Sequence, residues 1–166
     1  MQMNTLPKPA SPQRHSTQRP GMVLASVSAA RYVLPGLDEN AILALVEDGQ
    51  LLYAWNLGLG AARDMRIYPP CLVHYARTAG ARPFPDTEDE VSAALLGTLH
   101  VTTSTAWVTG RMLSLLFNCS STQIINMLDA RLLKLLPGTG WKTGPNGSPH
   151  ITADSLKQFL ISRRLP

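Results

Sequence analysis

Residues 109–164 read TGRMLSLLFNCSSTQIINMLDARLLKLLPGTGWKTGPNGSPHITADSLKQFLISRR and contain the clearest helical pattern of the chain. The hydroxyl of Thr109 can accept a hydrogen bond from an unpaired amide in a first helical turn, so we predict a helix that begins there. Its apolar face consists of Met112, Leu113, Leu116 and Phe117. The apolar stripe of the next helix is Ile124, Ile125 and Leu128. Because Ser120 or Ser121 can cap this second helix, the stretch predicts two short helices joined by a tight turn, a helix-turn-helix.

The residues after the second helix predict a β-hairpin that stands away from the body of the domain as a wing. An apolar run at 132–136, with Lys134 inside it, predicts the first strand. A glycine-rich loop from Pro137 to Gly147 follows, and 149–151 predicts the second strand. Thr152 can then cap a last helix. The inward-facing residues of that helix are Leu156, Phe159 and Leu160.

These features resemble the winged helix-turn-helix of the MerR and excisionase-like superfamily. The resemblance rests on the capped first helix, on CSSTQIINMLDARLL at 119–133 and on the end of the wing, SPHITADSL, at 148–156. It implies a small DNA-binding protein that bends DNA or regulates transcription.

A fainter copy of the same pattern occupies residues 22–82. Ser26 to Ile42 spans sixteen positions, and Thr109 to Ile125 spans the same sixteen. The spacing of Ile67, Leu72 and Tyr75 likewise repeats that of Ile151, Leu156 and Phe159. The predicted fold class is therefore mainly α with small β-hairpin wings, arranged as tandem winged helix-turn-helix domains. The rival interpretation is chance similarity between two small helical domains.

The repeat predicts the elements of this first copy. Its first helix spans 27–34, and Asp38 caps its second helix. The wing strands are expected at 51–55 and 66–68. A third helix starts at Pro69 or Pro70, where proline sacrifices no helical hydrogen bond, and ends near residue 78.

Charge and composition divide the chain into four parts. Residues 1–21 carry three basic groups and no acid, and four prolines among polar residues predict a disordered basic arm. Residues 22–82, the degenerate winged domain, have no net charge, because five arginines face five acids. Residues 83–106 form an acidic connector, and residues 107–166, the predicted DNA-binding domain, hold seven basic groups against two acids. The arm is either a solvated tail or a segment that contacts phosphates without reading sequence.

The acidic connector predicts one helix, capped by Asp86 or Thr87, whose acidic first turn is favourable against the helix dipole. An apolar seam follows, formed by Val91, Ala94, Leu95 and Leu99. The seam either packs on its own chain or makes a homodimer contact through residues 86–99. Residues 100–108 predict an extended segment that leads into the second domain.

The candidate DNA contacts lie mainly in the second domain. Side chains on the first turns of its second helix can enter a major groove, unless they form only a solvated polar face. These are Ser121, Thr122, Gln123 and Asn126. Candidates for phosphate contact are Arg111, Arg131, Lys134 and Lys142, and wing candidates are Trp141, Asn146, Ser148 and His150. The acids on the second helix of the first domain repel phosphate, so this domain either contacts DNA through Arg63 and Arg66 alone or serves mainly in pairing.

Other chemistry finds little support. GTGWKTG at 138–144 lacks the glycine before the lysine that a phosphate-binding loop needs. Cys71 and His74 form one closely spaced pair, whereas a structural zinc site needs four ligands. No nucleophile elbow and no acid pair suited to acid–base catalysis are present, so we expect no enzyme activity, no cofactor and no small-molecule ligand. No apolar run is long enough to span a membrane, and two cysteines suit a reducing compartment, so a cytoplasmic location is expected.

The sequence thus predicts a sequence-specific double-stranded DNA-binding protein. The resemblance implies a transcriptional regulator or an excisionase-like accessory factor in DNA recombination. The alternative from a different class is a winged-helix protein–protein interaction module that does not bind DNA.

Overall fold

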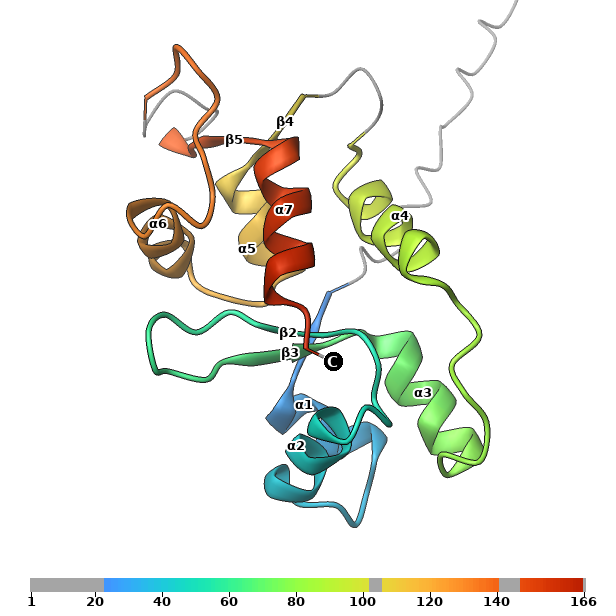
Figure 1. Ribbon diagram of the computed structural model, residues 1–166. Helices are drawn as coiled ribbons and strands as arrows, with labels where there is room; N and C mark the ends of the chain where they lie inside the picture. Colours follow the sequence, from blue (N-terminus) through green and yellow to red (C-terminus); the bar gives the residue numbers. More distant parts are fainter. Residues whose placement is uncertain (1–22, 102–105, 141–146, 166) are drawn as a thin grey trace, which may run out of the picture.

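The computed structural model describes residues 23–101, 106–140 and 147–165 (Figure 1). Within these residues the chain forms seven α-helices and two small antiparallel sheets. The first half contains β1 (Ala25–Ser26), α1 (Val27–Val33), α2 (Glu39–Glu47), β2 (Ala54–Asn56), β3 (Met65–Ile67) and α3 (Pro69–Thr78). The connecting helix is α4 (Glu88–Thr98). The second half contains β4 (Trp107–Thr109), α5 (Gly110–Leu116), α6 (Ser121–Asp129), β5 (His150–Thr152) and α7 (Ala153–Arg163).

The helix starts agree with the capping residues expected from the sequence. The side chain of Thr109 accepts from the amide of Met112, and that of Asp38 accepts from the amide of Ala41. Thr152, Ser120 and Thr87 cap α7, α6 and α4 in the same way. These predictions are confirmed because each cap needs only a hydrogen bond three residues along the chain.

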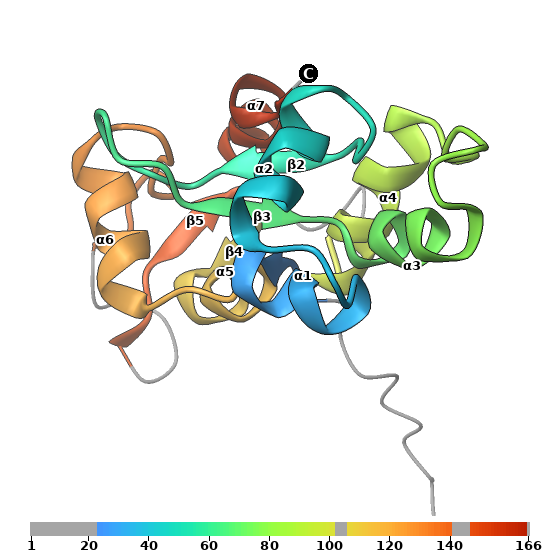
Figure 2. The same ribbon diagram turned by 90° about the horizontal axis from the view of Figure 1, so that it is seen from below.

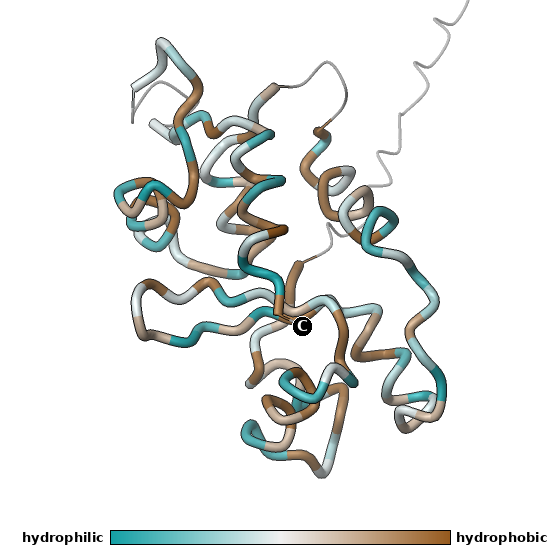
Figure 3. Tube along the Cα trace, in the orientation of Figure 1, coloured by the Kyte–Doolittle hydropathy of each residue, from teal (hydrophilic) through white to brown (hydrophobic). Residues whose placement is uncertain are grey.

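Both halves contain a short strand, two helices, a strand that pairs with the first one and a final helix, and the first half has β2 in addition. In the first half β1 pairs with β3, and Ala25 faces Ile67. In the second half β4 pairs with β5, and Val108 faces Ile151. The two pairings therefore share one register. Hydrophobic residues recur along the coils of α5 and α7 between hydrophilic ones (Figure 3).

The first strand of each wing is shorter in the structure than the sequence predicts. Tyr53 has φ +62°, which extended backbone does not allow, so β2 begins at Ala54 and not at residue 51. In the second half the amides of Leu132 and Leu133 bond back to the carbonyl of Met127 at the end of α6. In place of the strand predicted at 132–136, the structure has one isolated β-bridge, between Leu135 and Ile151.

The two halves pack on each other through one continuous hydrophobic core. The amide of Leu24 donates to the carbonyl of Leu116 (2.8 Å), and the amide of Leu165 donates to the carbonyl of Ala54 (2.8 Å). The indole of Trp55, on β2, donates to the carbonyl of Leu160 on α7 (2.8 Å). Two views place the three-stranded sheet between α6 on one side and α3 on the other (Figures 1 and 2).

The apolar seam of α4 is covered by the same chain. Val91, Leu95 and Leu99 are all at most 4% exposed. The ion pair between Glu88 and Arg164 and the hydrogen bond from the Tyr53 hydroxyl to the carbonyl of Asp86 hold the start of the helix against the body. Of the two interpretations of the seam, packing on its own chain agrees with this burial, and a homodimer contact through residues 86–99 stays a prediction. None of the described helices is long and apolar enough to cross a membrane.

Candidate nucleic-acid interface

Helices α5 and α6 form a compact pair whose turn spans residues 117–120. Asn118 takes the left-handed conformation in this turn (φ +49°), which asparagine tolerates better than most residues. The pair is held by buried side chains on both helices: Leu113, Leu116, Phe117, Ile124, Met127 and Leu128. The helical pitch makes positions 124, 127 and 128 one stripe, so Met127 takes the inward place predicted for Ile125. Ile125 lies outside the core and is 41% exposed.

Three of the four predicted base-reading residues lie on the open face of α6. Ser121, Thr122 and Asn126 are exposed, and Asp129 follows on the same face. Gln123 is half-buried on the edge of that face. Its Nε2 donates to a carboxylate oxygen of Asp64 in the β2–β3 loop (2.6 Å). Gln123 is therefore bound to the first half of the chain.

Three of the predicted phosphate contacts flank the helix pair. Arg111 lies in the first turn of α5, and Arg131 and Lys134 follow the end of α6. All three are exposed, and within the described residues none of them makes an ion pair. Their charge is therefore available to an anionic partner.

Arg66, which the sequence predicts as a DNA contact, is buried. It is 8% exposed, and its guanidinium donates to the carbonyls of Phe117 (2.7 Å) and Asn118 (3.1 Å) at the end of α5. It also forms an ion pair with Asp64. Since the last carbonyls of a helix have no intrahelical partner, Arg66 caps α5 from a distance of about fifty residues along the chain. It is not available to a phosphate.

Arg63, the other first-half candidate, remains at the surface. Its guanidinium pairs with the carboxylate of Glu47 on α2 at 2.6 Å, and its side chain is 70% exposed. In the β2–β3 loop Arg63 is thus paired within the first half, whereas Asp64, together with Arg66 on β3, reaches the second half.

The wing residues that the structure describes lie at the base of the hairpin. Ser148 Oγ accepts from the amide of Arg111 (3.0 Å) and so joins the wing to α5. The ring of His150 stacks on Trp107, with the ring centroids 3.9 Å apart, and its Nε2 is buried without a hydrogen-bond partner. His150 therefore packs on Trp107 at the base of the wing, and its role as a DNA contact stays a prediction. The predicted contacts Trp141, Lys142 and Asn146 lie outside the described residues.

A groove that the sequence did not suggest lies between α5, α6 and the base of the wing. It has a volume of about 410 Å³. Leu115, which is 62% exposed, and Ile125 both line it. The helical periodicity could have indicated this groove, because neither Leu115 nor Ile125 lies on the buried stripe of its helix.

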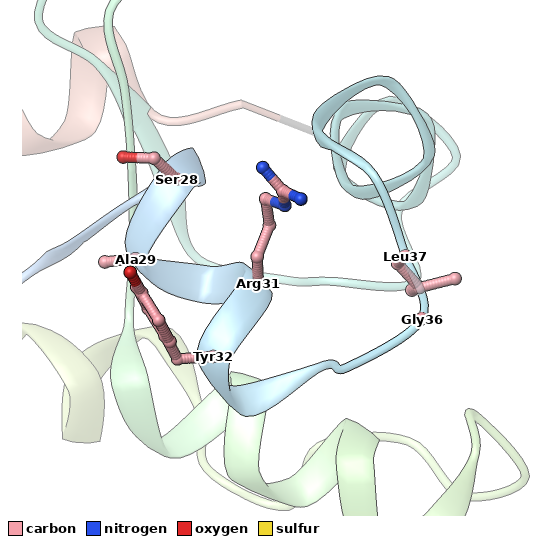
Figure 4. A pocket seen from close by; sticks show the side chains of 6 residues that line it. All are labelled: Ser28, Ala29, Arg31, Tyr32, Gly36 and Leu37. Atoms are coloured by element: carbon pink, nitrogen blue, oxygen red, sulfur yellow. The ribbon is translucent and has the colours of Figure 1, made fainter.

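The first half has a pocket beside α1 and the turn that follows it (Figure 4). A pocket of about 450 Å³ is lined there by Ser28, Ala29, Arg31, Tyr32, Gly36 and Leu37. Arg31 and Tyr32 leave α1 in different directions, and Tyr32 is 91% exposed. The exposed residues of α2 include Glu39, Asn40 and Glu47. The two halves therefore present different chemistry on equivalent helices.

Cys71 and His74 pack within the first half and are not arranged as metal ligands. Cys71 is buried, and burial raises the pKa of its thiol to about 11, which keeps it protonated at neutral pH. His74 donates through Nε2 to the carbonyl of Arg82 (3.1 Å) and packs edge-on against Phe84. In the described part of the chain no three His, Cys, Asp or Glu residues are grouped as a metal site.

Comparisons of this chain with protein-family models, with curated proteins and with solved structures find no match.

Proposed function

We propose that the protein is a sequence-specific double-stranded DNA-binding protein built from tandem winged helix-turn-helix units. The observation that carries the proposal is the open polar face of α6, flanked at both ends of the α5–α6 pair by cations without acidic partners among the described residues. An exposed helix of this kind fits the major groove of B-DNA, and flanking arginine and lysine neutralise phosphates.

In this proposal Asn126 reads bases and Arg111, Arg131 and Lys134 grip the backbone. Asparagine can bond to adenine N6 and N7 at the same time, which makes it a common reader of A·T pairs. Gln123 is proposed to position α6 and not to read bases, because its side-chain amide is bound to Asp64. Arg66 and Gln123 hold the helix pair against the first half, so α6 would enter the groove as part of a rigid body.

The first half positions the second and does not read bases in the same way. The exposed face of α2 carries Glu39 and Glu47, whose carboxylates repel phosphates. No catalytic step and no cofactor are part of the proposal. The biological role proposed is that of a transcriptional regulator or an excisionase-like recombination accessory factor. A footprint on the DNA upstream of the protein's own coding sequence would favour the regulator.

The salt dependence of duplex binding tests the proposal. Each phosphate contact contributes about 0.9 to the slope of log affinity against log salt. With about three to six contacts, the affinity of the full chain for random duplex should fall by about three to five orders of magnitude per tenfold rise in salt. Fluorescence anisotropy with a labelled duplex measures this slope. Binding that is flat in salt would contradict the proposal.

The second candidate function is a protein-binding winged-helix module. The observation that favours it is the exposure of Tyr32 and Leu115 on the equivalent helices α1 and α5. Retention on a heparin column separates the two, because a protein-binding module without a cationic face elutes at low salt.

A further inference from the structure

We propose that the open face of α6 recognises the 5-methyl groups of thymine in the major groove, and that Ile125 is the side chain that contacts them. The inference rests on the proposed DNA-binding function and names the base feature that the same site reads.

Two exposed apolar side chains meet at one groove beside the polar face of α6. Ile125 is 41% exposed and Leu115 is 62% exposed, and both line the groove of about 410 Å³ between α5, α6 and the wing base. A single exposed leucine or isoleucine is ordinary on a protein surface. Two of them that line one groove, beside a polar face, indicate a contact surface.

The charge around this groove fits a polyanion. Among the described residues its lining includes the cation Arg111 and no carboxylate, and the other polar side chains there are the serines 114, 121 and 148. The exposed acid of α6, Asp129, lies one helical turn beyond Ile125 towards the C-terminus. Therefore the N-terminal half of α6 is the part that suits entry into a DNA groove.

The major groove offers one apolar group for such a side chain. Thymine carries a 5-methyl group there, whereas adenine presents N7 and the N6 amino group. Ile125 and Asn126 are neighbours on α6, about 100° apart around the helix, and both are exposed. They can therefore address adjacent A·T pairs, Ile125 by the thymine methyl and Asn126 by the adenine edge. The site read by this face should contain such pairs.

Replacement of thymine by uracil tests this reading, because uracil lacks only the methyl group. The full chain is first used to enrich a preferred duplex from a random-sequence pool. The enriched duplex is then made with thymine and with deoxyuridine, and the two affinities are compared. For the unmodified protein we expect about a four-fold weaker affinity for each methyl group contacted, the fold-change that corresponds to about 0.8 kcal/mol per buried carbon.

Two variants assign the effect to the side chain. Ile125→Ala should bring the ratio of the thymine and deoxyuridine affinities close to one. The matched control is Ile161→Ala on α7, where the isoleucine is 60% exposed and far from the helix pair in sequence; its ratio should equal that of the unmodified protein. The thermal midpoints of both variants report that they are folded.

The outcomes separate this inference from the proposed function. If a duplex is enriched and the unmodified protein binds both forms equally, the methyl reading is wrong and DNA binding stands. If no duplex is retained at low salt, both proposals fail. If the unmodified protein sediments as a dimer that Ile125→Ala converts to a monomer, and the affinity ratio of the variant is unchanged, a second copy covers this face and the methyl reading is again wrong.

Discussion

Asn126 lies near the middle of the exposed face of α6, and its amide group has no partner in the described chain. Asn40, on the equivalent helix α2, is also exposed but lies beside Glu39 and shares its helix with Glu47. We predict that Asn126→Ala weakens the binding free energy for a preferred duplex by about 1–3 kcal/mol. The loss for random duplex should be far smaller, because only base contacts depend on sequence. Competition binding with the two duplexes measures both losses.

Asn40→Ala is the control for Asn126→Ala. Carboxylates beside it make α2 a poor partner for phosphate, so this change should leave both affinities nearly unaltered. An equal loss for Asn40 and Asn126 would mean that both helices read DNA and that α6 is not the principal reader.

At the scale of elements, the β2–β3 hairpin holds the helix pair of the second half. Arg66 caps the end of α5 and pairs with Asp64, which in turn accepts from Gln123 on α6. We predict that Arg66→Ala lowers the free energy of unfolding by about 2–4 kcal/mol, since it leaves buried carbonyls without a donor. Urea unfolding followed by circular dichroism measures the change.

Arg63→Ala, three residues earlier in the β2–β3 loop, is the matched variant. Its ion pair with Glu47 is exposed to solvent, so its loss should cost about 0–1 kcal/mol. If Arg63 proves as costly as Arg66, the capping role of Arg66 is wrong.

At the scale of the whole molecule, α4 completes the core and does not present a free seam. Leu95 is fully buried, and a buried leucine typically contributes about 2–5 kcal/mol, to which an unpaired buried charge adds a further cost. We therefore predict that Leu95→Glu prevents folding of the chain, while Ala93→Glu on the exposed side of the same helix is tolerated. Thermal unfolding of the two variants checks this. A folded, monomeric Leu95→Glu protein from a dimeric parent would show instead that the seam joins two chains.

Local chemistry made the starts of the helices predictable. A cap at Thr109, Asp38 or Thr152 forms between residues three positions apart, so any sequence window that contains both partners predicts it. The repeated spacing of the two halves can be read from the sequence, and the structure shows the same register in both, Ala25 with Ile67 and Val108 with Ile151.

The sequence by itself determined which segments become helices, where they are capped and which of their positions are apolar. Only the tertiary structure decided which polar groups are free. Arg66 contacts residues 51 and 52 positions away, and Gln123 meets Asp64 across 59 positions. No periodicity within a helix or strand encodes such distances, because they depend on how the two halves pack. For the same reason the seam of α4 could be read as an interface until its burial showed that the chain itself covers it.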